Sequence, residues 1–187
     1  MATEKKMDCV ILGFLSDGEA TGYEIKKRID TVLQFFWSAS YGSIYPTLSE
    51  LVRCGYAVSR EITDGGRSKI LYTITDEGRA VLSRWLMQPA ERDELRSETL
   101  LKLFFGKEGG EEQAALHIRA FRAKIQSGLE ELLVYEKVLR SCLHDDPAHR
   151  YYLATVTFGI KTYRAWLEWA DENLQCYQPI DKGDDQP

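Results

Sequence analysis

Apolar positions at helical spacing open the chain and predict two helices. The first covers residues 6–16 and presents Val10, Ile11, Phe14 and Leu15 on one side. Thr21 and Glu24 have the spacing of a capping box, in which each side chain bonds the backbone N–H of the other residue. They predict a second helix from Gly22 to about Phe36, whose inward positions are Tyr23, Ile25, Ile29 and Leu33.

A third helix is expected over residues 44–54, with Ser43 as its N-cap and Gly55 as its stop. Pro46 then falls in the first turn, where no intrahelical bond is lost. At ~100° per residue, the apolar side chains gather on one side of this helix, and they are Ile44, Leu48 and Leu51. The opposite side holds Pro46, Ser49 and Arg53, with Tyr45 beside them.

Two alternating segments follow, over residues 58–62 and 70–74, with Asp64-Gly65-Gly66 between them. Alternation around a glycine turn predicts a β-hairpin. Thr75 then caps a fourth helix that ends near Met87. Three helices followed by a two-stranded hairpin are the layout of a winged helix-turn-helix, in which one helix enters the major groove and the hairpin reaches the flanking backbone.

The second half of the chain is helical in pattern. Helices are expected over residues 94–105, 111–143 and 148–174, and the last two carry a seven-residue apolar repeat. Its positions are Ile118, Phe121, Ile125, Leu132, Tyr135 and Leu139 in the first long helix and Leu153, Val156, Ile160, Tyr163 and Leu167 in the second. The fold class is therefore mainly α, with a winged helix-turn-helix domain (1–88), a helical dimerisation domain (89–178) and a disordered tail (179–187).

The repeat suggests a homodimer through the two long helices. Their apolar surface is wider than one intramolecular seam needs, because Leu129, Leu133, Tyr152, Phe158 and Trp166 extend it. Helices that are apolar over much of their girth need more than one partner. The alternative is an intramolecular core in which the first helix covers the excess apolar surface.

The charge balance leaves nucleic-acid binding open. The chain has 187 residues and a net charge of −5, and 28% of its residues are charged. Residues 1–87 hold 11 basic and 11 acidic residues, whereas residues 88–187 hold 13 and 18. Binding depends on a local basic face rather than on the total. The candidate cations are Arg60, Arg67 and Lys69 on the hairpin and Lys26, Lys27 and Arg28 on the second helix, although a hairpin with ordinary solvated charges has the same pattern.

Other chemistry finds little support. The four cysteines form no CxxC pair, and the three histidines lie at no metal-ligand spacing. No phosphate loop, dinucleotide-binding or hydrolase motif occurs. No apolar run approaches the ~20 residues that span a bilayer, and no signal peptide is recognisable. We therefore expect a cytoplasmic protein with reduced thiols, without catalytic activity, metal or cofactor.

Three segments in the first half resemble the PadR family of transcriptional regulators. They are GYEI at 22–25, YGSIYPTLSELVRCGY at 41–56 and GGRSKILYTITDEGR at 65–79. The helical region that follows is similar to the virulence-regulator-like C-terminal domain of the longer family members. The resemblance implies a homodimeric winged-helix repressor that binds a palindromic operator and dimerises through its C-terminal helices.

The resemblance also implies where DNA would be contacted. The matching positions are Ser40, Tyr41, Gly42, Ser43, Tyr45, Pro46 and Ser49 on the third helix and Arg67 and Lys69 in the wing. Arg53, on the outward side of the third helix, and Tyr72, on the returning strand, complete the candidate set. The tyrosines have a second interpretation as core or second-layer packing.

Several members of the family respond to phenolic or polycyclic aromatic compounds. If this chain does so, Trp37, Trp85, Trp166 and Trp169 are candidates to line a pocket between the winged domain and the C-terminal helices. Plain packing is the alternative. Two other functions remain: a winged-helix dimer scaffold for protein interactions without DNA binding, and a ligand sensor without a dedicated operator.

Overall fold

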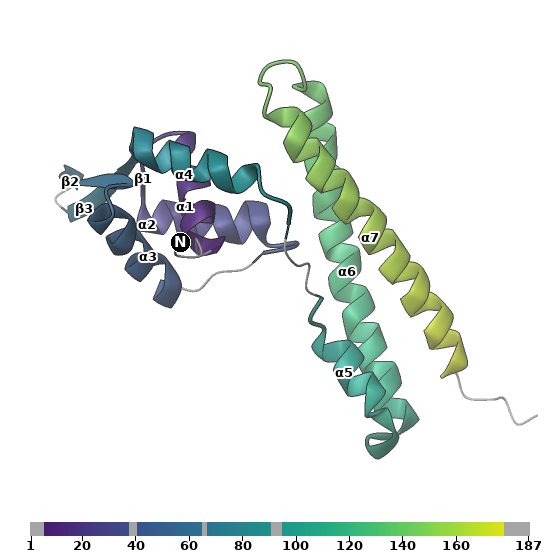
Figure 1. Ribbon diagram of the computed structural model, residues 1–187. Helices are drawn as coiled ribbons and strands as arrows, with labels where there is room; N and C mark the ends of the chain where they lie inside the picture. The colour runs from purple at the N-terminus through teal and green to yellow at the C-terminus, as the bar shows by residue number, and fades with distance from the viewer. Residues whose placement is uncertain (1–5, 38–40, 65–66, 91–94, 178–187) are drawn as a thin grey trace, which may run out of the picture. The chain divides into compact units, whose positions relative to one another are not determined.

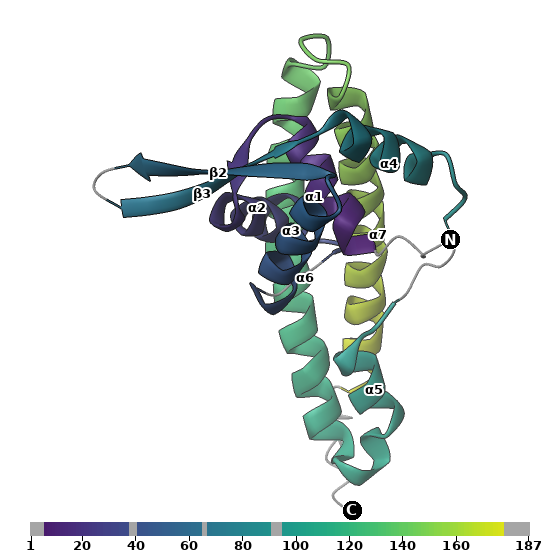
Figure 2. The ribbon, with the colours of Figure 1, turned by 60° about the vertical axis from the view of Figure 1, so that its left-hand side comes forward.

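The structure is a computed structural model that describes residues 6–37, 41–64, 67–90 and 95–177. The chain divides into two compact units, Met1–Asp93 and Glu94–Pro187, hereafter the first and second units. Figures 1 and 2 show the short helices and the sheet of the first unit and the long helices of the second. Each unit is described by itself.

In its described part, the first unit packs four α-helices on a three-stranded antiparallel sheet. The helices are α1 (Lys6–Ser16), α2 (Gly22–Arg28), α3 (Tyr41–Arg53) and α4 (Asp76–Leu86). The strands are β1 (Ala20–Thr21), β2 (Ala57–Asp64) and β3 (Arg67–Ile74), in the order β1-β3-β2. Strands β2 and β3 form the wing and pair from Ala57 with Ile74 to Asp64 with Arg67. The fold class predicted from the sequence is confirmed.

The core of the first unit joins all four helices to the base of the sheet. Ile11, Ile25, Ile44 and Leu48 are fully buried, and Val81 of α4 is 4% exposed. The sheet adds the inward positions of its strands, namely Ala20, Ala57, Tyr72 and Ile74. Burial of the α3 stripe at every third or fourth residue fixes which side of that helix faces outward.

The local signals at the helix starts act as predicted. Thr21 and Glu24 form the capping box, with the Thr21 N–H donating to the Glu24 carboxylate at 2.7 Å. This hydrogen bond lowers the pKa of Glu24. The Thr75 hydroxyl accepts from the Gly78 N–H at 3.1 Å and begins α4. Strand β1 was not predicted, because two residues carry no alternation.

The second helix departs from its prediction. Regular α-helix ends at Arg28, and a π-helical turn covers Ile29–Leu33. Tyr23 was expected to face inward but is 61% exposed. Each hydrogen bond of a π turn spans one more residue than in an α-helix, a shift that apolar spacing does not reveal. Tyr23 precedes this turn, and the inward side of α2 holds Gly22 and Ile25 instead.

The third helix begins three residues earlier than predicted, at Tyr41. Ser43 is therefore wrong as an N-cap, because it lies within the helix, where its carbonyl accepts from the Thr47 hydroxyl at 2.7 Å. Pro46 consequently lies past the first turn and removes the bond that an N–H at this position would donate to the Gly42 carbonyl. The predicted start assumed that proline must stand within the first turn.

The second unit consists of one short and two long helices among its described residues. They are α5 (Glu98–Phe104), α6 (Gly110–Ser141) and α7 (His149–Cys176), with a 3-10 turn at Gly106–Glu108. The long helices lie side by side and antiparallel (Figures 1 and 2). A Cβ placed on Gly128 would stand 2.6 Å from the Tyr163 ring, and one on Gly159 would stand 3.1 Å from Leu132. Glycine therefore allows the two helices to approach closely.

The heptad positions pack largely within this single hairpin. Ile118, Ile125, Leu132 and Ile160 are buried between α6 and α7 in one chain. The others, Phe121, Tyr135, Leu139, Leu153, Val156, Tyr163 and Leu167, are half-buried. The seam is thus occupied by the chain's own helices, and the dimer prediction rests on the apolar surface that extends beyond it.

Candidate nucleic-acid interface

The outward side of α3 is the most distinctive polar surface of the first unit. Its exposed residues are Gly42, Tyr45, Pro46, Ser49, Glu50 and Arg53. Glu50 and Arg53 are the only charged residues between Tyr41 and Arg53, so the helix has no net charge. Hydroxyl groups, a ring and a single ion pair therefore make up this face.

Tyr45 lies where α3 meets the start of α2. It is 46% exposed, yet its ring covers Gly22 so closely that a Cβ there would stand 2.7 Å from Cε1 of Tyr45. Tyr45 also lies near Tyr72, whose pKa is raised first by burial and then by this neighbour. One side of the ring is held by α2 while the other remains open to solvent.

The serines of α3 satisfy part of their hydrogen bonding within the helix. The Ser49 hydroxyl donates to the Tyr45 carbonyl at 3.1 Å and keeps its acceptor lone pairs at an exposed position. Ser43 is half-buried. Ser40 and the side chain of Tyr41 lie outside the described residues, so these two candidates stay predictions.

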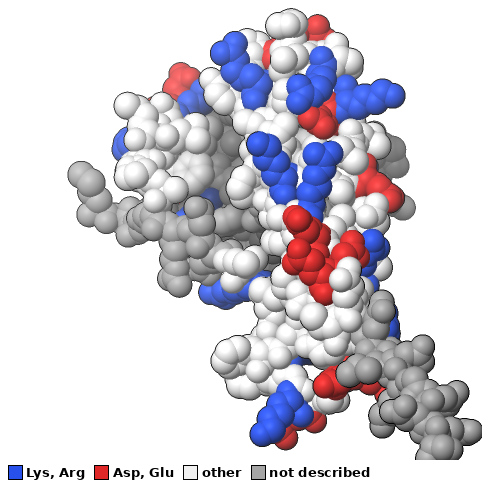
Figure 3. All heavy atoms as spheres, turned by 90° about the vertical axis from the view of Figure 1, so that its right-hand side faces the viewer, with Lys and Arg blue, Asp and Glu red and all other residues white. Residues whose placement is uncertain are grey.

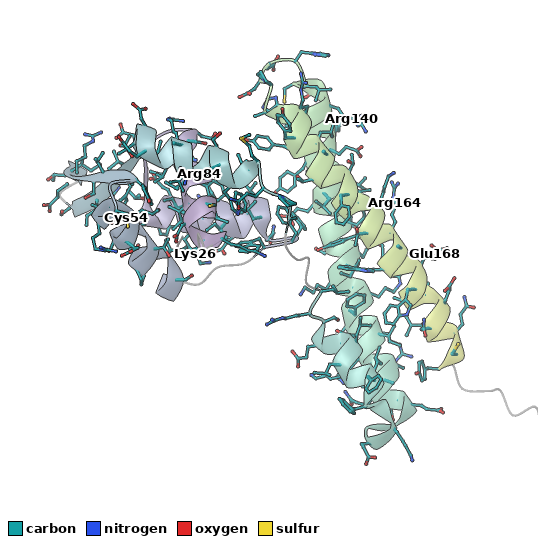
Figure 4. All side chains as sticks on the ribbon, viewed as in Figure 1. Lys26, Cys54, Arg84, Arg140, Arg164 and Glu168 are labelled. Carbon is teal, nitrogen blue, oxygen red and sulfur yellow. The ribbon has the colours of Figure 1, made fainter. Side chains whose placement is uncertain are left out.

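Several cations of the first unit have partners within the same unit. Arg60 of β2 bonds the Glu19 carboxylate at 2.8 Å and so links the wing to the loop before β1. Lys26 of α2 pairs with Asp30 (Figure 4 labels Lys26), and Arg28 donates to the Phe14 carbonyl at 3.4 Å. Arg53 pairs with Glu50, which raises the pKa of the arginine. Two of the six candidate cations, Lys26 and Arg60, are therefore paired with carboxylates of the same unit.

The wing carries the remaining candidates. Lys69 is exposed on β3, and its charge contributes to the lowered pKa of Glu24. Arg67 begins β3, but its side chain lies outside the described residues. Tyr72 is 7% exposed and belongs to the core, because its position on β3 faces the helices. We therefore reassign Tyr72 from DNA contact to packing.

Two acidic residues of this surface were not among the candidates. Glu50 stands three residues before Arg53, a spacing at which helix side chains meet, so the sequence held a usable signal for this pair. Glu19 and Arg60 are 41 residues apart, and only the fold brings them together. The acidic partners matter because they reduce the charge that the wing and α3 offer to a polyanion.

The four tryptophans are divided between the units. Trp37 and Trp85 belong to the first, and the Nε1–H of Trp37 is buried without an acceptor among the described residues. Trp166 and Trp169 lie on α7, with ring centroids 6.0 and 5.7 Å from that of Phe121. Trp166 also stacks on Tyr163 at 5.3 Å. Packing accounts for the second pair, and a pocket that includes all four stays a prediction.

Membrane and metal chemistry gain no support from the described part of the chain. None of its helices is long and apolar enough to cross a bilayer. No group of three potential metal ligands occurs in the described ranges. Cys9 is buried and Cys54 is exposed at the end of α3 (Figure 4), where partial desolvation of the thiol first and then the Glu50 carboxylate raise its pKa.

The geometry defines a winged-helix protein, and comparison with known proteins gives its family. Residues 11–84 match the transcriptional regulator PadR-like family, and residues 95–177 match the C-terminal domain of virulence activator alpha. The negative transcriptional regulator PadR of Bacillus subtilis is 32% identical over 84% of this chain and 91% of its own length. The chain belongs to the PadR family of transcriptional regulators.

Solved structures agree with this assignment. Bacillus subtilis PadR in complex with operator DNA superposes with a TM-score of 0.78, at 27% identity, over 93% of this chain and 100% of that chain. The structure of the same protein in complex with p-coumaric acid superposes with a TM-score of 0.71, at 27% identity, over 92% of this chain and 99% of that chain. The winged-helix architecture and the longer, two-domain form of the family, both expected from the sequence, are confirmed.

Proposed function

We propose that this transcriptional regulator is a repressor that binds a palindromic operator as a homodimer, through α3 of each subunit. The exposed polar side of α3 carries this proposal, because it stands on a winged helix whose relative was solved with operator DNA. On this proposal the protein acts by binding DNA rather than by catalysis, and it is located in the cytoplasm, where DNA is accessible. Domain roles follow: residues 1–88 bind DNA and 89–178 dimerise.

The dimensions of α3 suit a major groove. Its 13 residues span ~20 Å at 1.5 Å per residue, and the groove is ~12 Å wide. Gly42 has no side chain and that of Pro46 is compact, so the backbone in the first half of the outward side can approach base edges. Tyr45 and Ser49 then offer hydroxyl groups for sequence discrimination, while Lys69 and Arg67 of the wing contact phosphates.

We propose that a second copy of the chain covers the apolar surface that is exposed on the second unit. The hairpin buries its own seam, yet Phe158 remains 70% exposed and Phe104 82%. Other exposed apolar residues are Leu101, Phe105, Val134, Val138 and Tyr151. Figure 3 shows uncharged surface between clusters of basic and acidic side chains on one face of this unit. An apolar area of this kind is typical of a protein interface.

The outward residues thus replace the heptad seam as the proposed dimer contacts. The half-buried members of the repeat, such as Tyr135 and Leu153, can still contribute at its edges. The four buried members act by shaping the hairpin, because they have no exposed surface to offer.

A small aromatic effector is the proposed signal for release. Bacillus subtilis PadR was solved with p-coumaric acid. This chain supplies exposed aromatic residues and a buried Trp37 N–H that has no acceptor within the described ranges. Thermal-shift screening of phenolic and polycyclic aromatic compounds tests the proposal. A ligand that raises the Tm should also weaken DNA binding; stabilisation without release would leave the tryptophans as packing.

Binding to the DNA upstream of the protein's own gene tests the main proposal. A labelled duplex should show sequence-selective, salt-sensitive binding, with two subunits bound for each operator. A competitor duplex of random sequence should displace it only at large excess. Absence of selectivity would favour a winged-helix interaction module without specific DNA binding.

A further inference from the structure

Three side chains meet at the C-terminal end of α3. The Glu50 carboxylate accepts from Nε of Arg53 at 2.8 Å and from Nη2 at 2.5 Å, each through a different oxygen. The Cys54 thiol donates to the same carboxylate at 3.5 Å. A two-point pair of this kind fixes the plane of the guanidinium as well as neutralising its charge.

We propose that Glu50 limits the sequence-independent attraction of this protein for DNA by keeping Arg53 engaged and off the phosphates. The inference rests on the proposed DNA-binding role of α3. Arg53 is the single cation of that helix, and without Glu50 the outward side would present a free guanidinium to the polyanion. With Glu50 present the helix has no net charge, so hydroxyl groups rather than charge determine which DNA sequence it binds.

Exposure favours a role toward a partner over a purely structural one. The Arg53 side chain is 72% exposed and that of Glu50 is 47% exposed, and both stand on the side of α3 opposite its buried stripe. Exposed ion pairs add little to folding stability. Near DNA the same pair matters more, because each cation that reaches a phosphate releases counterions and steepens the salt dependence by ~0.9.

The pair makes an unusual prediction for single and double variants. Glu50→Gln and Glu50→Ala release Arg53, so binding to a random-sequence duplex should strengthen and the slope of log K against log[salt] should steepen by ~0.9. When the salt concentration falls from 200 to 50 mM, the affinity of either variant should therefore rise about 3.5-fold more than that of wild type. Arg53→Ala removes the cation that offsets the Glu50 charge and should weaken binding without making the slope shallower.

The double variant Glu50→Gln/Arg53→Ala should return close to wild type in both affinity and slope, since neither charge remains. Glu136→Gln is the matched control, because half-buried Glu136 and exposed Arg140 form an ion pair within α6 at 2.7 Å. This control should leave DNA binding and dimer mass unchanged. Circular dichroism and thermal unfolding of each variant confirm that the fold is retained.

Two results would overturn the inference. An unchanged slope in both Glu50 variants would show that Arg53 stays off DNA without Glu50. A slope made shallower by ~0.9 in Arg53→Ala would show that Arg53 already binds a phosphate beside Glu50. Failure of the wild-type protein to bind any duplex in a salt-sensitive way is a separate outcome, because it rejects the proposed function itself and this inference with it.

Discussion

Helix α3 and the α6–α7 hairpin pack in the same way on their inner sides but differ in the residues that they expose. In both, an apolar stripe is buried within its own unit, as Leu48 and Ile160 show. Outside, α3 presents Ser49 and one neutral ion pair, whereas α7 presents Phe158, which is 70% exposed. The inward stripe therefore reports the fold, and the chemistry of the outward side indicates the class of partner: DNA for the first and a second protein chain for the second.

The largest expected effect is on the apolar outer side. Phe158→Asp places a charge at the centre of the proposed subunit contact and should give a monomer at micromolar concentration, because burying an unpaired charge is strongly unfavourable. Light scattering measures the mass, and operator binding should fall with it, since one subunit reads only half of a palindrome. Ser127→Asp adds the same charge at an exposed polar position of α6 and should leave the dimer intact. A Phe158→Asp dimer would refute the proposed contact.

Two glycines sharpen the comparison between the units. In Gly128→Ala the new methyl group meets the Tyr163 ring, which is half-buried and stacked on Trp166, so we expect a loss of about 2 kcal/mol. In Gly22→Ala it meets the Tyr45 ring, which is 46% exposed, and stands 3.2 Å from the buried Leu48 side chain. Because the closer of these two neighbours lies at the surface, the loss should be smaller, about 1 kcal/mol. Urea unfolding of both variants measures the two losses. Equal losses would contradict the proposed difference in how the two rings are held.

The wing and α3 should separate affinity from selectivity. Arg67→Ala should weaken binding to all duplexes and make the salt slope shallower by ~0.9. Ser49→Ala should change the preferred sequence and cost about 1 kcal/mol at the operator, the usual net value of a hydrogen bond. Selection from a random-sequence duplex library, with salt titrations of each variant, distinguishes them. If both variants behave alike, the division of roles between wing and helix is wrong.

The smallest effect concerns the Cys54 thiol. Because partial desolvation and the Glu50 carboxylate raise the pKa of this exposed thiol, less thiolate is present near neutral pH and alkylation is slowed. Glu50→Gln removes the second cause, so iodoacetamide should modify Cys54 faster, by roughly two-fold. Mass spectrometry of the peptide that contains Cys54 follows the reaction. An unchanged rate would mean that the carboxylate does not influence the thiol.

Local signals were read correctly from the sequence where they involve near neighbours. The first helix begins and ends at residues 6 and 16 as predicted, and the capping box and the two paired strands of the wing are present. Each depends on residues within a few positions, so spacing alone is enough. The winged-helix order and the family followed from these elements together.

The misses have physical reasons of their own. The predicted start of α3 is too late because it puts Pro46 in the first turn, where helices prefer proline. In this helix Pro46 lies beyond the first turn. Strand β1 and the Glu19–Arg60 pair depend on contacts between distant residues. A heptad repeat does not tell whether its partner belongs to the same chain, so the seam pointed to a dimer that only the outer residues now support.

Salt-dependent binding to the upstream duplex, measured by fluorescence anisotropy, tests the central claim most directly. The account predicts selective binding by a dimer, with a log–log slope set by the wing and unchanged in Glu50→Gln/Arg53→Ala. Binding that is absent, or equally strong to random sequence and insensitive to salt, would contradict it.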